Sequence, residues 1–131
     1  MDKVVYLCGV PYREISGATQ LCLTTHAVDV RWGFHYLEVK DTGQIDDLIT
    51  AMQEKFGLKC RLAHPEPINS FAPSRTEAPG TVHAFLLEVL EDDENHKNEY
   101  RRKWCFPVEA KLRIRRKPVQ WLVDDAMSKL S

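Results

Sequence analysis

Apolar side chains recur at helical spacing in the middle of the chain, between Asp46 and Phe56. The positions that would form one buried face are Ile45, Leu48, Ile49, Met52 and Phe56. This spacing is typical of an amphipathic helix that buries one side. Asp46 and Asp47 would lie in the first turn, where the helix dipole favours carboxylates. Gly57 follows at the place of a helix C-cap. We therefore predict a helix over Asp46–Phe56.

Runs of apolar and β-branched residues predict the strands of a sheet. The strongest run is Thr81–Leu90. Shorter runs are Val4–Val10, Thr19–Thr25, Lys59–Ala63 and Arg102–Phe106. Runs of this length, bounded by turn-forming residues, are typical of strands.

The remaining segments predict two more helices and three connections. The helices are Val108–Ile114 and Pro118–Leu130, the second with a proline in its first turn. The connections are a turn at Pro11–Gly17, an irregular segment with four prolines at His64–Gly80, and a charged loop at Glu91–Lys97. Strands around a central helix, with another helix at the end, favour an α/β or α+β sandwich.

The length of 131 residues predicts one domain, residues 1–131. Hydrophobic content of 44% and charged content of 28% are ordinary for a soluble globular chain. No run of about 18 apolar residues is present, and the N-terminus has no targeting pattern, so we expect no membrane contact. Four widely spaced cysteines without a C-x-x-C motif favour buried, reduced thiols in a cytoplasmic protein.

Charge is unevenly distributed, although the net charge is only −1. Residues 1–96 hold 8 basic and 15 acidic side chains, whereas residues 97–117 hold 9 basic and 2 acidic ones. A basic segment of this kind favours an anionic partner nearby. A solvated edge that balances the acidic part of the chain explains the same pattern.

The end of the predicted central helix carries a motif. Met52, Gly57 and Leu58 have the spacing of the last scaffold letters of the box G-x5-E-x7-R-E-U-x-E-E-x-G-U, where U is a bulky aliphatic residue. This box marks the Nudix hydrolases, which the chain therefore resembles. When the last Gly of the box is aligned with Gly57, the final U falls on Leu58 and the internal U on Met52, so the letters that serve the fold are mostly kept.

Most letters that carry the chemistry of that box are replaced. The R-E pair falls on Thr50 and Ala51, the E-E pair on Glu54 and Lys55, the earlier Glu on Thr42 and the opening Gly on Tyr36. The family's glycine lets the loop take an unusual backbone path that a tyrosine resists. The resemblance therefore predicts the fold more clearly than the activity.

Segments outside the box also resemble the family. Trp32-Gly33-Phe34 is similar to the W-G-F-P-K-G approach to the box, and Gly9–Arg13 with Gln20–Thr25 is similar to its opening hairpin. Phe106–Ala110 is similar to a segment of the diadenosine and diphosphoinositol polyphosphate branch. The resemblance covers nearly the whole chain and implies a Nudix-like α/β/α sandwich with a mixed central sheet.

The resemblance implies a divalent metal that neutralises a diphosphate and activates water. Magnesium prefers hard oxygen ligands. The corresponding positions are Ala51, Glu54 and Lys55, so only Glu54 remains as a catalytic remnant, and a lysine beside it opposes metal binding. We therefore expect an eroded metal site.

A rebuilt site is the alternative. Asp47 and Glu54 are seven residues apart and share a helical face, and Glu38 and Asp41 are expected in the loop before the helix. These carboxylates would be the replacement ligands for Mg2+ or Mn2+. Asp46 and Asp47 are equally explained as first-turn carboxylates of a helix.

Candidate ligand-binding residues come from aromatic and basic positions. Trp32 would stack on a base if it lies at a cleft. Arg101, Arg102 and Lys103, and the basic residues from Arg113 to Lys117, would bind polyphosphate or RNA through charge. Such clusters are also common on protein surfaces. His83, inside an apolar strand, favours a sheet-face role over that of a base.

Three functions follow as hypotheses. The first is a Nudix-family protein that binds a nucleotide, polyphosphate or RNA without efficient hydrolysis. The second is an active pyrophosphohydrolase of nucleoside diphosphate derivatives or dinucleoside polyphosphates, with replacement carboxylates. The third is a structural subunit with an exposed apolar patch. The sequence leaves the ligand and the oligomeric state open.

Overall fold

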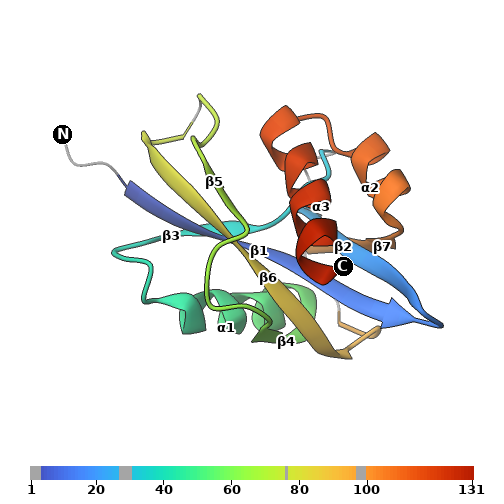
Figure 1. Cartoon of the computed structure of the whole chain (residues 1–131). Helices are drawn as coiled ribbons and strands as arrows, with labels where there is room; N and C mark the ends of the chain where they lie inside the picture. Colours follow the sequence, from blue (N-terminus) through green and yellow to red (C-terminus); the bar gives the residue numbers. More distant parts are fainter. Residues whose placement is uncertain (1–3, 27–30, 76, 97–99) are drawn as a thin grey trace.

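The computed structural model describes residues 4–26, 31–75, 77–96 and 100–131. In these residues a mixed sheet lies between helix α1 (Ile45–Phe56) on one face and helices α2 (Pro107–Arg113) and α3 (Lys117–Leu130) on the other, as Figure 1 shows. The strands are β1 (Val4–Ile15), β2 (Ala18–His26), β3 (Tyr36–Val39), β4 (Leu58–Leu62), β5 (Asn69–Phe71), β6 (Gly80–Asp92) and β7 (Tyr100–Cys105). The predicted α/β/α sandwich with a mixed sheet is confirmed.

The sheet is built around two long strands, β1 and β6. They pair in parallel from Val4 beside Gly80 to Tyr12 beside Glu88. The free edge of β1 pairs first with β3 and then with β2, and β7 pairs with β2. The free edge of β6 pairs first with β5 and then with β4. Short strands β3 and β5 therefore lie at one end of the sheet, and β2, β7 and β4 at the other.

Two apolar clusters fill the space on either side of the sheet. The α1 side is formed by buried residues such as Leu7, Leu48, Met52, Phe56, Leu58 and Leu87. The side of α2 and α3 is formed by residues such as Val10, Leu21, Leu23, Val82, Ile114 and Leu122. All four cysteines are buried and free, as expected. Burial raises the pKa of the Cys22 and Cys60 thiols to about 12, so both are protonated at neutral pH.

The central helix forms where the apolar spacing predicts it. Helix α1 buries Leu48, Met52 and Phe56 and ends at Gly57, which is left-handed with a φ of 69°. The Gly57 N–H donates to the carbonyl oxygens of Gln53 and Met52. This geometry closes the helix, as expected for a glycine at that position.

Two predicted connections begin too early, because the strands before them are longer than predicted. The expected turn at Pro11–Gly17 is strand as far as Ile15, and the turn itself is Ser16-Gly17, both with positive φ. Pro11 is tolerated because it lies between the residues that pair with β3 and those that pair with β2. The expected loop at Glu91–Lys97 begins later, because β4 pairs with β6 as far as Asp92. Lys97 lies outside the described residues.

Strand β3 was not predicted from the sequence, because it has only four residues. Glu38 was expected in a loop, but it lies in β3 and pairs with Tyr6 of β1. Tyr36 also lies in this strand, opposite Cys8. The position of the family's opening glycine therefore has an ordinary extended backbone here, which a tyrosine adopts without strain.

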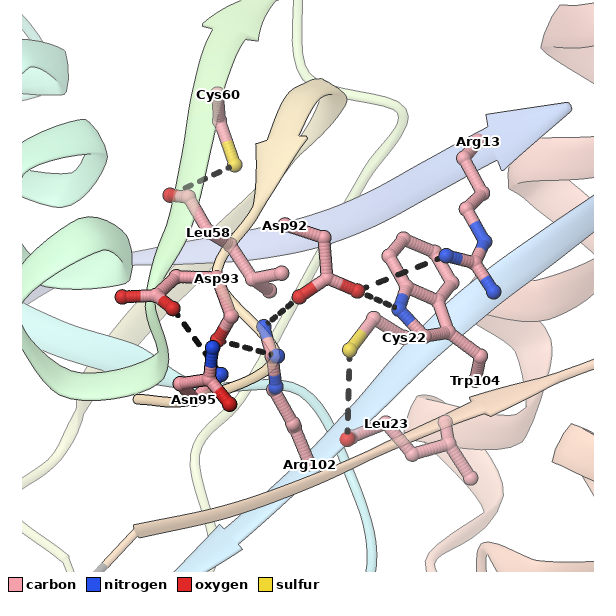
Figure 2. A network of polar contacts seen from close by, with 10 residues as sticks. All are labelled: Arg13, Cys22, Leu23, Leu58, Cys60, Asp92, Asp93, Asn95, Arg102 and Trp104. Atoms are coloured by element: carbon pink, nitrogen blue, oxygen red, sulfur yellow. Dashed lines mark hydrogen bonds and ion pairs between the residues drawn. The ribbon is translucent and has the colours of Figure 1, made fainter. Parts of the chain in front are cut away.

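A largely buried ion-pair network ties three strands together on the α1 side of the sheet (Figure 2). Asp92 of β6 forms a salt bridge with Arg102 of β7 and accepts a 2.7 Å hydrogen bond from Nε1 of Trp104. Arg13 of β1 lies 3.6 Å from the same carboxylate and 4.0 Å above the Trp104 ring. This carboxylate is therefore the shared partner of two guanidinium groups and an indole.

The described helices include none that is both long and apolar enough to cross a membrane.

Candidate functional site

A cleft of about 680 Å³ opens where the 31–36 segment meets the start of β7 and the link between α2 and α3. Its aromatic lining comes from Trp32, Phe34, Tyr36, Phe56 and Tyr100. Its charged lining comes from Arg31, Arg115, Arg116 and Glu77, and His35 adds an imidazole. This volume is within the range of small-ligand sites, about 300–1,000 Å³. The combination of flat aromatic rings and guanidinium groups suits a ligand with a base and phosphates.

Trp32 is held at the cleft by backbone contacts on both sides. Gly33 exchanges two hydrogen bonds of 2.8 and 3.1 Å with Thr24 of β2. Trp32 itself forms a bridge with Ile114, the residue that ends α2. The Arg101 guanidinium lies 5.9 Å from the centre of the indole ring. The backbone around Trp32 is therefore fixed between the sheet and the end of α2, and the residue lines the cleft.

One wall of the cleft is an aromatic cluster at the end of α1. His35, Phe56 and Tyr100 pack edge to face, with ring centres 5.3 to 6.3 Å apart. The Lys55 ammonium lies 3.4 Å from Nε2 of His35 and 5.3 Å from the centre of the Tyr100 ring. Burial, and then the charge of Lys55, lower the pKa of His35 to about 4. The imidazole is therefore neutral at pH 7, and its Nε2 can accept a hydrogen bond from the ammonium.

This pKa predicts the behaviour of His35 in acid. An NMR titration of the imidazole should show a midpoint near 4 instead of the ordinary 6.5. In the unfolded chain the group protonates at the ordinary pKa, so between pH 6.5 and 4 the unfolded state binds more protons and the folded state loses stability as the pH falls. In Lys55→Met the midpoint should move upward. A midpoint near 6.5 in the native protein would contradict this environment.

Another part of the lining, Ser74 and Glu77, belongs to a segment that is tied to β3 and α3. The Tyr36 hydroxyl donates to the Glu77 carboxylate, which also accepts a 2.7 Å bond from the Ser74 hydroxyl. Burial alone raises the pKa of Glu77, but the bonds from Tyr36 and Ser74 and the charge of Arg116 outweigh it and leave the pKa lowered. Arg116 anchors the loop by donating to the Ala72 carbonyl at 2.7 Å. The cleft therefore has an ionised carboxylate facing a guanidinium.

The structure separates the predicted basic cluster of β7. Arg101 and Lys103 alternate with Arg102, so their side chains leave opposite faces of the sheet. Arg101 lies by Trp32, whereas Arg102 is committed to Asp92. Only Arg101 of the three contacts a residue of the cleft in a described interaction. In the second basic segment, Arg113 pairs with Glu109, whereas Arg115 and Arg116 line the cleft.

The side chains at the box positions do not fit the divalent cation that the family resemblance implies. Ala51 has no oxygen ligand, and Lys55 places an ammonium where a carboxylate would be needed. Glu54 is exposed, and Asp47 accepts a 2.9 Å hydrogen bond from the Gln44 side chain. Among the residues with a described placement, no three His, Cys, Asp or Glu side chains are grouped as a metal site.

Comparison of the sequence with models of known families and with curated proteins finds no match. Comparison of the structure does. The Ap4A hydrolase of C. elegans is similar with a TM-score of 0.79 at 17% identity, covering 99% of this chain and 100% of that chain. The NUDIX domain of Shewanella oneidensis NrtR, solved with ADP ribose, has a TM-score of 0.75 at 9% identity, covering 100% and 90%. This chain has the Nudix fold.

A third solved structure with a similar fold is a pyrophosphohydrolase. The dihydroneopterin triphosphate pyrophosphohydrolase of E. coli has a TM-score of 0.65 at 12% identity, covering 92% of each chain. In this fold the kept scaffold letters have direct structural roles, because Met52 and Leu58 are fully buried and Gly57 caps the helix. These three residues therefore serve the packing of α1 and the end of that helix.

Several cleft residues were not predicted as ligand-binding residues. Tyr36 and His35 had a signal, since they replace letters of the W-G-F-P-K-G approach and of the box. Tyr100 and Glu77 had none, because Tyr100 lies between the predicted charged loop and the predicted strand, and Glu77 lies in a proline-rich segment without a periodic pattern. Arg115 and Arg116 were part of a basic run, but the run does not show which of its members face a cleft.

Proposed function

We propose that this protein is a member of the Nudix family that binds a nucleotide or nucleoside polyphosphate in the Trp32 cleft without efficient hydrolysis. One observation carries the proposal. A cleft lined with aromatic rings and guanidinium groups lies beside a helix in which Ala51 and Lys55 occupy the positions of metal-binding carboxylates. Such a site keeps the means of binding a nucleotide and lacks most of the means of cleaving it.

Each class of cleft residue has a role in this proposal. Trp32 stacks on the base, because an indole offers a large flat apolar surface. Arg31, Arg115 and Arg116 bind phosphate oxygens, for which planar guanidinium groups are well suited. Glu77 accepts hydrogen bonds from sugar hydroxyls or a base amino group. The similar NUDIX domain bound to ADP ribose and the similar Ap4A hydrolase support a nucleotide as the ligand class.

Replacing Trp32 by alanine should weaken binding of ADP-ribose about 10- to 100-fold, since base stacking is worth about 1–3 kcal/mol. Calorimetric titration in the presence of EDTA measures the change. Trp121→Ala is the matched control, because this exposed indole of α3 is not among the cleft residues. Equal affinities for the two variants would place the ligand elsewhere. A single-stranded RNA titrated in parallel shows whether RNA shares the site.

An active pyrophosphohydrolase is the second candidate, and the hydrolases among the similar structures favour it. It would need Mg2+ or Mn2+, held by Glu54 with Asp47, Glu38 or Asp41. Two of these replacements already have local partners, since Asp47 accepts from Gln44 and Asp41 accepts from the Gly43 N–H at 2.7 Å. Turnover that requires metal and is lost in Glu54→Gln would favour this candidate over the first.

A further inference from the structure

We infer that the Lys55 ammonium takes the place of the divalent cation and binds the ligand's phosphate directly, so that binding needs no metal. This inference rests on the proposed function, because it names the group that receives the phosphate in the same cleft. It follows from a difference between the family's box and this chain: the box has metal-binding carboxylates where this chain has Ala51 and Lys55.

The position of the ammonium supports this role. Lys55 is not itself among the residues that line the cleft, but its ammonium contacts two that are, His35 and the Tyr100 ring. Lys55 belongs to the last turn of α1, directly before Phe56, which also lines the cleft. A phosphate beside His35 and Tyr100 therefore lies next to a fixed positive charge.

The charge at the box positions agrees with binding in the absence of metal. Three carboxylates at positions 51, 54 and 55 would repel a phosphate until a cation screened them. Here Ala51 is neutral, and Glu54 and Lys55 have opposite charges. The anionic ligand therefore meets no excess of negative charge from these three positions.

His35 sets the position of the ammonium. Its imidazole packs against the rings of Phe56 and Tyr100, and its backbone carbonyl accepts a 3.0 Å bond from Gly9 of β1. With ring and backbone both fixed, Nε2 provides an acceptor at a defined place for Lys55. The end of a flexible lysine chain is thereby held beside His35, which lines the cleft.

Binding of ADP, inorganic diphosphate and adenosine, each with EDTA and with Mg2+, tests the inference. The wild type should bind ADP with the same affinity in EDTA as in Mg2+, and the same should hold for diphosphate. Lys55→Met should weaken ADP about 10- to 100-fold, the loss expected for a hydrogen bond to a charged group, and leave adenosine unchanged. Lys55→Arg should keep most of the affinity. Lys129→Met, an exposed lysine at the end of α3, controls for the lost charge.

The outcomes separate the two proposals. If Lys55→Met binds ADP like the wild type, or if wild-type binding requires Mg2+, the inference is wrong while nucleotide binding stands. If the folded wild type binds none of the three compounds, the proposed function fails and the inference with it. If thermal unfolding shows that Lys55→Met is not folded, Lys55→Gln compared with Lys55→Arg carries the same test.

Discussion

Replacing Asp92 by alanine is expected to lower the free energy of unfolding by about 3–5 kcal/mol, the usual loss when one partner of a buried ion pair is removed. The side chains of Asp92 and Arg102 are only 15% and 17% exposed. Without the carboxylate, the Arg102 guanidinium and the Trp104 indole N–H lose their shared acceptor, and Arg13 loses its ion-pair partner (Figure 2). An unpaired charge in this environment costs more than the lost contact alone.

Urea denaturation of Asp92→Ala and of Glu91→Ala measures this effect. Glu91 is the neighbouring carboxylate on β6, but its side chain is exposed. Its removal should change the free energy of unfolding by about 0.5 kcal/mol or less, as is usual for surface substitutions. Similar losses in both variants would show that the network of Asp92 contributes nothing particular to stability.

Gly57→Ala is expected to lower the free energy of unfolding by about 2–5 kcal/mol. Part of this is the cost of a left-handed conformation for a residue with a Cβ, about 1–2 kcal/mol. The rest is steric, with about 1–3 kcal/mol typical of overpacking. A Cβ at position 57 would lie 2.6 Å from the Cβ of His96, which is closer than real contacts allow.

Gly17→Ala separates the two contributions to the Gly57 effect. Gly17 also has a positive φ, 81°, but a Cβ there would meet nothing within 4 Å. Its replacement should therefore cost only the conformational part. If thermal or urea unfolding gives the same loss for both variants, the close packing of His96 against Gly57 does not contribute.

Local patterns in the sequence predict most of the fold. Helix α1 and its cap could be read from the spacing of Leu48, Met52 and Phe56 and from Gly57, because these signals depend only on near neighbours. Strands β1, β2, β4, β6 and β7 were predicted with end errors. The errors at Ile15 and Asp92 share one cause, since pairing with a neighbouring strand extends an element beyond its own apolar pattern.

The cleft could be predicted only in part, because distant segments form it. The hydrogen bond between Tyr36 and Glu77 joins residues 41 positions apart, and no local sequence pattern predicts it. Trp32 was recognised from a motif. Arg102 was grouped with Arg101 by charge, but the alternation of a strand sends the two side chains to opposite faces of the sheet. A run of basic residues in the sequence therefore predicts a larger basic surface than one face of a strand can present.

The central claim is that this Nudix fold binds a nucleotide without a metal and without efficient cleavage. The most direct test is to follow binding and product release together for ADP-ribose and a panel of dinucleoside polyphosphates, with EDTA, Mg2+ or Mn2+. We predict binding that EDTA leaves unchanged, and no turnover in any condition. Turnover that depends on metal and disappears in Glu54→Gln would contradict this account.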